Sequence, residues 1–170
     1  MARYCKQKDL HSCGPVLVLN SLKWAGEKVT HDGTITPLKI LCGQKRGSGT
    51  STRNFIQALR IVGDKMFQTL TIRPRRKPTL KEMEQHLRKG GAVALEFHWV
   101  EKNGFKDPKK WKFRGHYALA TAVNESGSRF TLVNAFSGGK ASEKLSRNKF
   151  KKHMLGSQAN LHAWFLKRRG

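Results

Sequence analysis

The apolar positions in the first third of the chain recur with a helical period. Residues 14–25 carry an almost continuous apolar run behind Pro15, and Gly26 follows it, so we expect a largely buried helix there. The stretch "TSTRNFIQALRIVG", residues 50–63, places its apolar side chains on one helical face behind hydroxyl residues that can cap it. This stretch predicts a second helix, closed by Gly63.

Two further elements complete the first half of the chain. The stretch "TLKEMEQHLRKGG", residues 79–91, predicts a helix, because Thr79 and Glu82 have the spacing of a capping box and two glycines end the pattern. Residues 66–74 are typical of a strand. Residues 27–49 contain several glycines and a proline, and we expect them to be irregular.

After these helices the apolar pattern changes to that of strands. β-Prone runs are separated by a long basic loop, residues 101–114, and by a tight turn, which predicts antiparallel pairing. The predicted strands are residues 92–100, 116–124, 129–136 and, at the tail, 161–170. With helices first and sheet second, the chain is predicted to be an α+β domain. Its length suits one domain, residues 1–170.

The composition is strongly basic. Lys and Arg number 34 against 11 Asp and Glu, which gives a formal net charge of +23 and a pI of about 10.6. Such a surface attracts polyanions, so we expect a nucleic acid or another polyanion as a partner. The content of 38% hydrophobic and 9% aromatic residues argues against a globally disordered chain.

The cysteines and the apolar runs indicate a compartment. Cys5, Cys13 and Cys42 are an odd number and too few for a disulfide framework, which favours free thiols in a reducing environment. No apolar run is long enough to span a membrane, and residues 1–9 lack the apolar segment of a signal peptide. We therefore expect a protein of the cytoplasm or of a virus particle, with no membrane partner, no metal and no cofactor.

Cys13 stands at the beginning of the first predicted helix. A helix N-terminus offers unpaired N–H groups and the positive end of a dipole, both of which lower the pKa of a thiol. The position suits a nucleophile, and from the position alone a small buried side chain is an equal alternative.

The other groups that a thiol nucleophile needs have candidates elsewhere in the chain. His116 begins one predicted strand and Asn134 ends the next, so antiparallel pairing can bring an imidazole base and an orienting amide side by side. Gln7 lies shortly before the nucleophile and is an uncharged donor suited to an oxyanion.

This series of residues resembles a known family. Gln7, the Cys13-Gly14-Pro15 sequence, His116 and Asn134 resemble the papain-like cysteine peptidases, in particular the branch that cleaves bacteriocin leader peptides after a double glycine. The spacings also resemble those of phytochelatin synthase, a papain-like transpeptidase. Both groups usually carry Asp where this chain has Asn134, which is similar to papain itself.

The resemblance implies a fold, a site and a substrate class. A papain-like domain has an N-terminal helical half that carries the nucleophile and a C-terminal antiparallel sheet that carries the histidine and the third residue. By this resemblance Cys13 is the nucleophile, His116 the general base, Asn134 the orienting residue and Gln7 an oxyanion donor, and the substrate is a polypeptide.

Other residues compete for these roles. Cys42 precedes Gly43, but no apolar helix follows it, and His98 on the preceding strand is a rival base. His11 with Cys5 and Cys13 lacks a fourth metal ligand at finger spacing. The "GSGTST" sequence before the second helix lacks the lysine of a phosphate-binding P-loop, so we interpret it as a capped loop.

Basic clusters with interleaved aromatic side chains predict a nucleic-acid surface. The segment at 105–114 alternates cations with aromatic side chains, a pattern that suits phosphate contacts and base stacking. The candidate nucleic-acid residues are Lys109, Lys110, Lys112, Arg114, Arg75 and Arg76.

The sequence therefore supports two hypotheses for the function. The first is a cysteine peptidase that works near nucleic acid, as a viral processing protease packaged with its genome would. The second is a nucleic-acid-binding or particle-structural protein built on a peptidase-like scaffold. The reactivity of the Cys13 thiol separates them.

Overall fold

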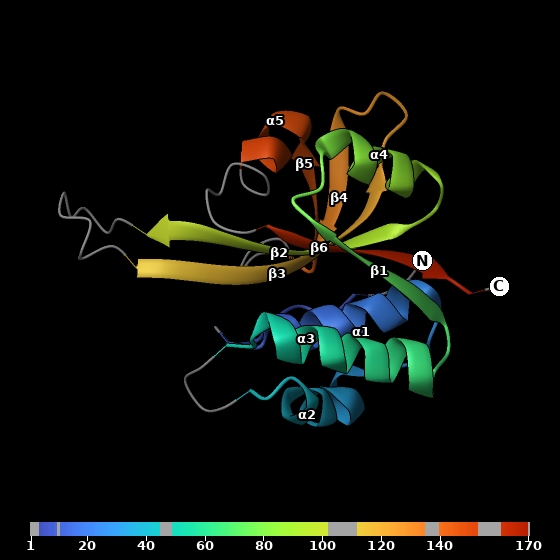
Figure 1. The fold of residues 1–170 in the computed structure, drawn as a ribbon, viewed down its shortest axis with the longest axis vertical. Coiled ribbons are helices and arrows are strands. Elements are labelled where there is room, and N and C mark those ends of the chain that lie inside the picture. The colour runs from blue at the N-terminus through green and yellow to red at the C-terminus, as the bar shows by residue number, and fades with distance from the viewer. Residues whose placement is uncertain are drawn as a thin grey trace.

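The structure is a computed structural model that describes residues 4–9, 11–44, 49–101, 112–134, 140–152 and 161–169. On one side of a six-stranded sheet two helices lie against the sheet and a third packs on their outer side, and two more helices cover the other face (Figure 1). The helices of the first face are α1 (Cys13–Ala25), α2 (His31–Leu41) and α3 (Thr52–Leu59), which a π-helix, η1 (Arg60–Met66), extends. Those of the second face are α4 (Leu80–Arg88) and α5 (Arg147–Phe150).

The sheet is antiparallel at each pairing and has the order β1-β6-β2-β3-β4-β5. Its strands are β1 (Leu70–Arg76), β2 (Ala92–Glu101), β3 (Lys112–Val123), β4 (Arg129–Val133), β5 (Ser142–Ser146) and β6 (His162–Arg168). The C-terminal strand lies inside the sheet, between β1 and β2. The predicted α+β class, with helices first and sheet second, is confirmed.

Alternation along the strands builds a core on each face of the sheet. One cluster joins α1, α2 and α3 to alternate sheet residues such as Leu119 and Trp164. The second joins α4 to the residues between them, such as Ala118 and Ala163. Because side chains alternate between the two faces of a strand, each central strand contributes to both cores.

Helix α1 is buried on nearly all sides, as its continuous apolar run predicts. Its residues from Cys13 to Leu22 are all buried. Gly26 ends the helix in a left-handed conformation with φ of 108°, and its N–H returns to the carbonyls of the last turn. Helix α1 is therefore held firmly against one face of the sheet, and its N-terminus can position a side chain.

The structure differs from the sequence prediction in five places. The strand predicted over residues 66–74 begins only at Leu70, because Met66 still belongs to η1. Residues 27–49 are not wholly irregular, because α2 begins after Thr30, whose side chain accepts from the N–H of Gly33, and continues through Pro37. The helix predicted to close at Gly63 continues as η1. β3 begins at residue 112, so the end of the predicted loop is strand, and β5 with α5 was not predicted.

Candidate active site

Cys13 is the first residue of α1 and is 6% exposed. The residue after it, Gly14, leaves room for a close neighbour: a Cβ at this position would lie 2.6 Å from Oγ1 of Thr50. The hydroxyl of Tyr117 in β3 donates to the Thr50 carbonyl at 3.3 Å. The start of the nucleophile helix is thus packed between the segment before α3 and the central strand β3.

The protonation of Cys13 is set by two opposed effects. Burial raises the pKa of the thiol, and the backbone N–H groups of Tyr117, Gly14 and Cys13 itself lower it, with a net pKa above the ordinary value. The helix N-terminus alone predicts a lowered pKa for Cys13, and this prediction is wrong because the effect of burial is larger. The contact with the Tyr117 N–H also places Sγ beside the residue that follows His116.

His116 lies in β3 opposite Phe97 of β2 and is 3% exposed. Its Nε2 atom is 2.7 Å from the main-chain oxygen of Asn134. Since a carbonyl only accepts, the neutral ring carries its proton on Nε2 and keeps Nδ1 as the proton acceptor. Burial lowers the pKa of His116, and the bond to Asn134 opposes this effect, so the ring is held neutral.

Asn134 ends β4 in the left-handed conformation, with φ of 55°. Its N–H donates to the carbonyl of Ala141 at 3.0 Å. Its side-chain Nδ2 donates to Oε1 of Gln7 and to the carbonyl of Tyr117, both at 3.3 Å. The residue therefore holds the imidazole through its main chain and the N-terminal segment through its side chain.

Gln7 lies buried against this pair, at 3% exposure. Its Oε1 accepts from Asn134, and its Nε2 donates to the carbonyl of Asp9. The segment that carries it is fixed to α1 by Asn20, which accepts from the N–H of Cys5 at 2.8 Å and donates to the Cys5 carbonyl at 2.9 Å. Asn20 was not singled out from the sequence, although a fully buried amide in an apolar helix is a signal of such a clamp.

Asp9 is a second residue that the sequence analysis missed. Its Oδ1 accepts from the N–H groups of His11 and Ser12, both at 2.8 Å, and so supports the turn that leads into α1. Its Oδ2 lies 3.1 Å from Nζ of Lys39. Burial raises the pKa of Asp9, but these hydrogen bonds and Lys39 lower it more, and the pKa lies below the usual range. An Asp shortly before a helix is a capping signal that could have identified it.

A buried carboxylate lies on the strand next to the one that carries His116. Glu96 of β2 pairs with Tyr117 in the sheet register and is 4% exposed. Oγ1 of Thr52 donates to its two oxygens at 2.7 and 2.8 Å, and Nδ1 of His162 lies 3.3 Å away. Burial and Glu96 raise the pKa of Tyr117, so its hydroxyl stays protonated as a donor. These contacts connect the beginning of α3 to β2, which pairs with the strand that carries His116, and to β6.

The competing residues occupy different surroundings. Burial raises the pKa of Cys42 to about 12, which makes this thiol a poor nucleophile near neutral pH. His98 lies in β2, and its side chain is outside the described residues. Within the described part of the chain, no three His, Cys, Asp or Glu side chains are arranged to hold a metal ion. In the same residues, no helix is long and apolar enough to cross a membrane.

The predicted nucleic-acid residues are only partly described. Lys109 and Lys110 lie outside the described residues, and Lys112 and Arg114 are placed in β3 with their side chains outside them. Arg75 and Arg76 are exposed near the end of the edge strand β1.

The comparisons with known proteins rest on structure. No protein-family model and no curated protein sequence matches the chain. The peptidase domain of Streptococcus ComA, a bi-functional ABC transporter involved in quorum sensing, superposes with a TM-score of 0.66 at 15% identity, over 99% of this chain and 100% of that one. A double-glycine-motif protease from an AMS/PCAT transporter, solved with the leader peptide, gives 0.62 at 13% identity, over 99% and 93%.

A third solved structure agrees with these two. A C39-like peptidase from Bacillus anthracis superposes with a TM-score of 0.60 at 10% identity, over 99% of this chain and 96% of that chain. The chain therefore has the fold of C39-type peptidase domains from end to end. The resemblance to the double-glycine branch of the papain-like peptidases is confirmed at the level of the fold.

Proposed function

We propose that residues 1–170 form one cysteine peptidase domain that acts on a polypeptide. The observation that carries this proposal is the bond from Nε2 of His116 to the Asn134 carbonyl, in the residue that directly precedes Tyr117, whose N–H contacts the Cys13 thiol. With the proton on Nε2, Nδ1 is the basic nitrogen of the neutral imidazole, the atom type that general-base catalysis on a thiol requires. The fold of double-glycine and C39-type peptidases, one of them solved with a leader peptide, supports a polypeptide substrate.

In the first step His116 removes the proton from the Cys13 thiol at Nδ1, and Sγ attacks the carbonyl carbon of the scissile bond. The C=O bond becomes a C–O⁻ bond in a tetrahedral intermediate. When this intermediate collapses, the C–N bond breaks and the imidazolium gives its proton to the leaving amine. A thioester on Cys13 remains.

The oxyanion needs donors at the start of α1. The main-chain N–H of Cys13 is one, as in other nucleophiles at helix N-termini. Gln7 is the other: of the two N–H groups on its amide nitrogen, one donates to the Asp9 carbonyl, and the second would donate to the intermediate. In the second step His116 takes a proton from water, which attacks the thioester and releases the acid product and the thiol.

The test of the peptidase proposal is thiol-specific. A peptide-based electrophile should label wild-type protein at one cysteine, identified by mass mapping as Cys13, and cleavage of a peptide library should disappear in Cys13→Ala. Cys42→Ala is the matched control, since it also removes a buried thiol near Thr50. Cleavage that survives Cys13→Ala, or that Cys42→Ala also abolishes, would contradict the assignment.

A second activity, binding to nucleic acid without sequence preference, is favoured by the charge. The net charge of +23 is combined with exposed cations on β1, among them Arg75 and Arg76. We include Lys109, Lys110, Lys112 and Arg114 in this surface on their sequence alone. A peptidase with such a surface would work beside nucleic acid, as a viral processing protease does. Binding should weaken about 10³-fold or more between about 50 and 200 mM salt if six or so phosphates are contacted.

A further inference from the structure

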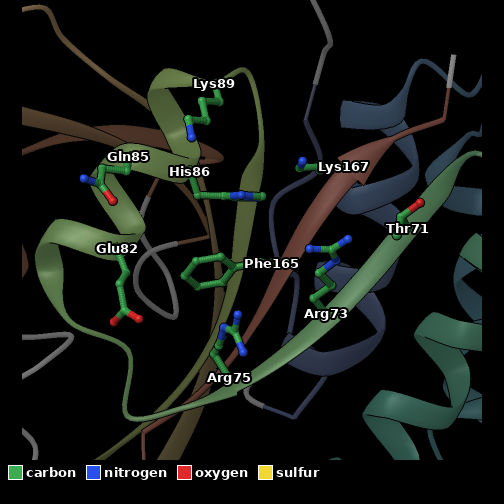
Figure 2. A pocket seen from close by; sticks show the side chains of 9 residues that line it. All are labelled: Thr71, Arg73, Arg75, Glu82, Gln85, His86, Lys89, Phe165 and Lys167. Atoms are coloured by element: carbon green, nitrogen blue, oxygen red, sulfur yellow. The ribbon is translucent and has the colours of Figure 1, made fainter.

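A basic pocket lies on the face of the sheet opposite the nucleophile helix. It has a volume of about 230 Å³ and is formed by β1, β6 and α4. Figure 2 shows two aromatic rings near its centre with cations around them. The residues that matter here are Arg73, Arg75, Lys89, Lys167, His86 and Phe165.

The alternation of β1 explains why these cations gather on this face. Leu70 and Ile72 point into the core formed with α1 and α3, so Arg73 and Arg75 point to the α4 side. In the register of β1 with β6, Arg73 lies opposite Phe165. A strand whose inner face is apolar thus presents a row of guanidinium groups beside an aromatic ring.

The pocket keeps an excess of positive charge. Some basic side chains of the described residues are paired with carboxylates, as Arg88 and Arg147 are with Glu84. No carboxylate of the described residues lies within ion-pairing distance of the four pocket cations, Arg73, Arg75, Lys89 and Lys167. Glu82 is the carboxylate of the lining; it accepts from the N–H and hydroxyl of Thr79 at 2.7 and 2.8 Å, and the charge of Arg75 also lowers its pKa. It offsets one of the four positive charges and leaves the other three. The pocket therefore has the charge of an anion site.

The two rings form a fixed platform. His86 and Phe165 lie with centroids 4.7 Å apart, and His86 Nε2 is 2.8 Å from the Leu166 carbonyl. A Cβ on Gly91 would lie 2.2 Å from the same nitrogen, so the ring occupies space that only glycine leaves. Burial lowers the pKa of His86, and the charges of Lys167 and Arg73 lower it further. The platform is therefore neutral and suits stacking.

The dimensions favour one unit of a polymer over a small ligand. A volume of 230 Å³ is below the usual range of about 300–1,000 Å³ for drug-sized ligands. Arg73 and Arg75 are two residues apart on a strand, about 6.8 Å, a spacing that suits successive phosphates of an extended strand. An acidic peptide would use the cations and leave the aromatic platform without a role, whereas a nucleotide uses both.

We propose that this pocket binds single-stranded nucleic acid, with Arg73 and Arg75 on successive phosphates and Phe165 stacked against a base. The inference rests on the nucleic-acid binding proposed above and gives it a location. Because the pocket and Cys13 lie on opposite faces of the sheet, nucleic acid and a polypeptide substrate can be held at the same time (Figure 1).

The experiment compares two variants of equal net charge. The pocket variant replaces the four pocket cations with glutamine, and the control variant replaces four exposed cations beyond the other edge of the sheet, namely Lys144, Lys149, Lys151 and Lys152. Fluorescence anisotropy measures binding of a short oligothymidylate against salt. For the pocket variant we expect the slope of log affinity on log salt to fall by about 1.4 for the two arginine contacts, at about 0.7 per phosphate contact, and by up to about 3 where Lys89 and Lys167 also contact phosphates. For the control variant we expect a change below about 0.7.

Phe165→Leu tests the stacking separately. It should weaken oligothymidylate binding about tenfold and leave binding of inorganic polyphosphate unchanged, because polyphosphate has no base. The site would be wrong, although nucleic-acid binding itself would stand, if the salt slope fell equally in the two charge variants. The same holds if Phe165→Leu bound oligothymidylate as tightly as wild type does. A wild-type protein that binds no oligothymidylate at about 50 mM salt would overturn both. None of these readouts depends on the peptidase.

Discussion

The imidazole of His116 is hydrogen-bonded to the main-chain oxygen of Asn134, at 2.7 Å from Nε2. A main-chain acceptor is supplied by the backbone conformation, here a φ of 55°, whatever side chain the residue carries. The Asn134 side chain contributes in another way, through its bonds to Gln7 and to the Tyr117 carbonyl. The role of this residue is therefore divided between ring orientation and attachment of the N-terminal segment.

Substitutions at Asn134 should accordingly be milder than loss of the base. His116→Ala should lower kcat/KM by about 10²–10⁴ or more, because it removes the proton acceptor. Asn134→Gly keeps the main-chain carbonyl and relieves the left-handed backbone conformation. We expect it to retain most of the kcat/KM that His116→Ala loses. Asn134→Ala should be less stable than Asn134→Gly by about 1–2 kcal/mol, since it must adopt the same φ.

Asn134→Asp gives the sharpest comparison in this series. Aspartate tolerates the left-handed conformation and keeps the main-chain carbonyl that holds the imidazole, so Asn134→Asp should keep more activity than His116→Ala. Its carboxylate cannot donate to the Gln7 side chain or to the Tyr117 carbonyl, so the variant should be less stable than wild type. Steady-state kinetics with one peptide substrate, together with denaturant unfolding, measures each effect. An Asn134→Gly enzyme as inactive as His116→Ala would show that the side chain is the essential part.

The reactivity of Cys13 should increase with pH across the neutral range. Burial raises the pKa of its thiol, and burial lowers the pKa of His116, so both groups are neutral near pH 7 and the thiolate accumulates only as the pH rises toward the raised thiol pKa. The rate of iodoacetamide labelling should therefore be low at pH 6. It should still be rising at pH 9, the ordinary pKa of a thiol, because the pKa of Cys13 lies above that value. Mass mapping at each pH gives the rate for each cysteine.

Two controls accompany that titration. Cys42 should label more slowly than Cys13 throughout, because its pKa is about 12. His116→Ala should slow labelling of Cys13 near pH 7, where the imidazole assists removal of the proton. A labelling rate for Cys13 that is flat from pH 6 to 9 would instead indicate a preformed thiolate–imidazolium pair and would contradict the neutral resting state.

The sequence could predict the helices and strands in which apolar and polar positions alternate with a clear period. α4 has the capping box expected from Thr79 and Glu82, and α3 is capped by Ser51 within the predicted hydroxyl stretch. α2 was missed because Gly33 and Pro37 are typical of irregular segments, and its two buried side chains, Ile35 and Leu38, are too few for a clear apolar face. Packing against α1 and α3 explains the helix better than local propensity.

The site was predictable only where it depends on strand pairing. The 18-residue separation of His116 and Asn134 indicated neighbouring strands, and the structure brings the two together. It could not indicate that the contact uses the Asn134 carbonyl, because every residue has one and only the conformation selects it. The raised pKa of Cys13 likewise depends on burial by distant segments, which the residues next to Cys13 do not reveal.

Asp9 should stabilise the turn that precedes the nucleophile. Asp9→Ala removes the acceptor for the N–H groups of His11 and Ser12, and we expect a loss of about 0.5–2 kcal/mol in the free energy of unfolding, the range for a helix cap. Since the Asp9 carbonyl also accepts from Gln7, kcat should fall as the turn loosens. Asp32→Ala is the control, because Asp32 is an exposed acid at the start of α2 and should leave kcat unchanged.

Gly14 should be required for the close approach of Thr50 to the nucleophile helix. In Gly14→Ala the new Cβ would lie 2.6 Å from Oγ1 and 2.7 Å from Cβ of Thr50, so one of the two segments must move. Overpacking of this kind costs about 1–3 kcal/mol of stability, and a shift of the first turn of α1 would also move Cys13. Both the midpoint of denaturant unfolding and the labelling rate of Cys13 should fall.

A double-mutant cycle separates this clash from a general effect of the added methyl group. Thr50→Gly removes every Thr50 atom that the new Cβ would meet, so Gly14→Ala should cost less in the Thr50→Gly background than in wild type, by roughly 0.5–3 kcal/mol. Gly49→Ala, at a position where a Cβ meets nothing within 4 Å, should be neutral. Equal costs of Gly14→Ala in both backgrounds would show that Thr50 is not the obstacle and that the helix start has another constraint.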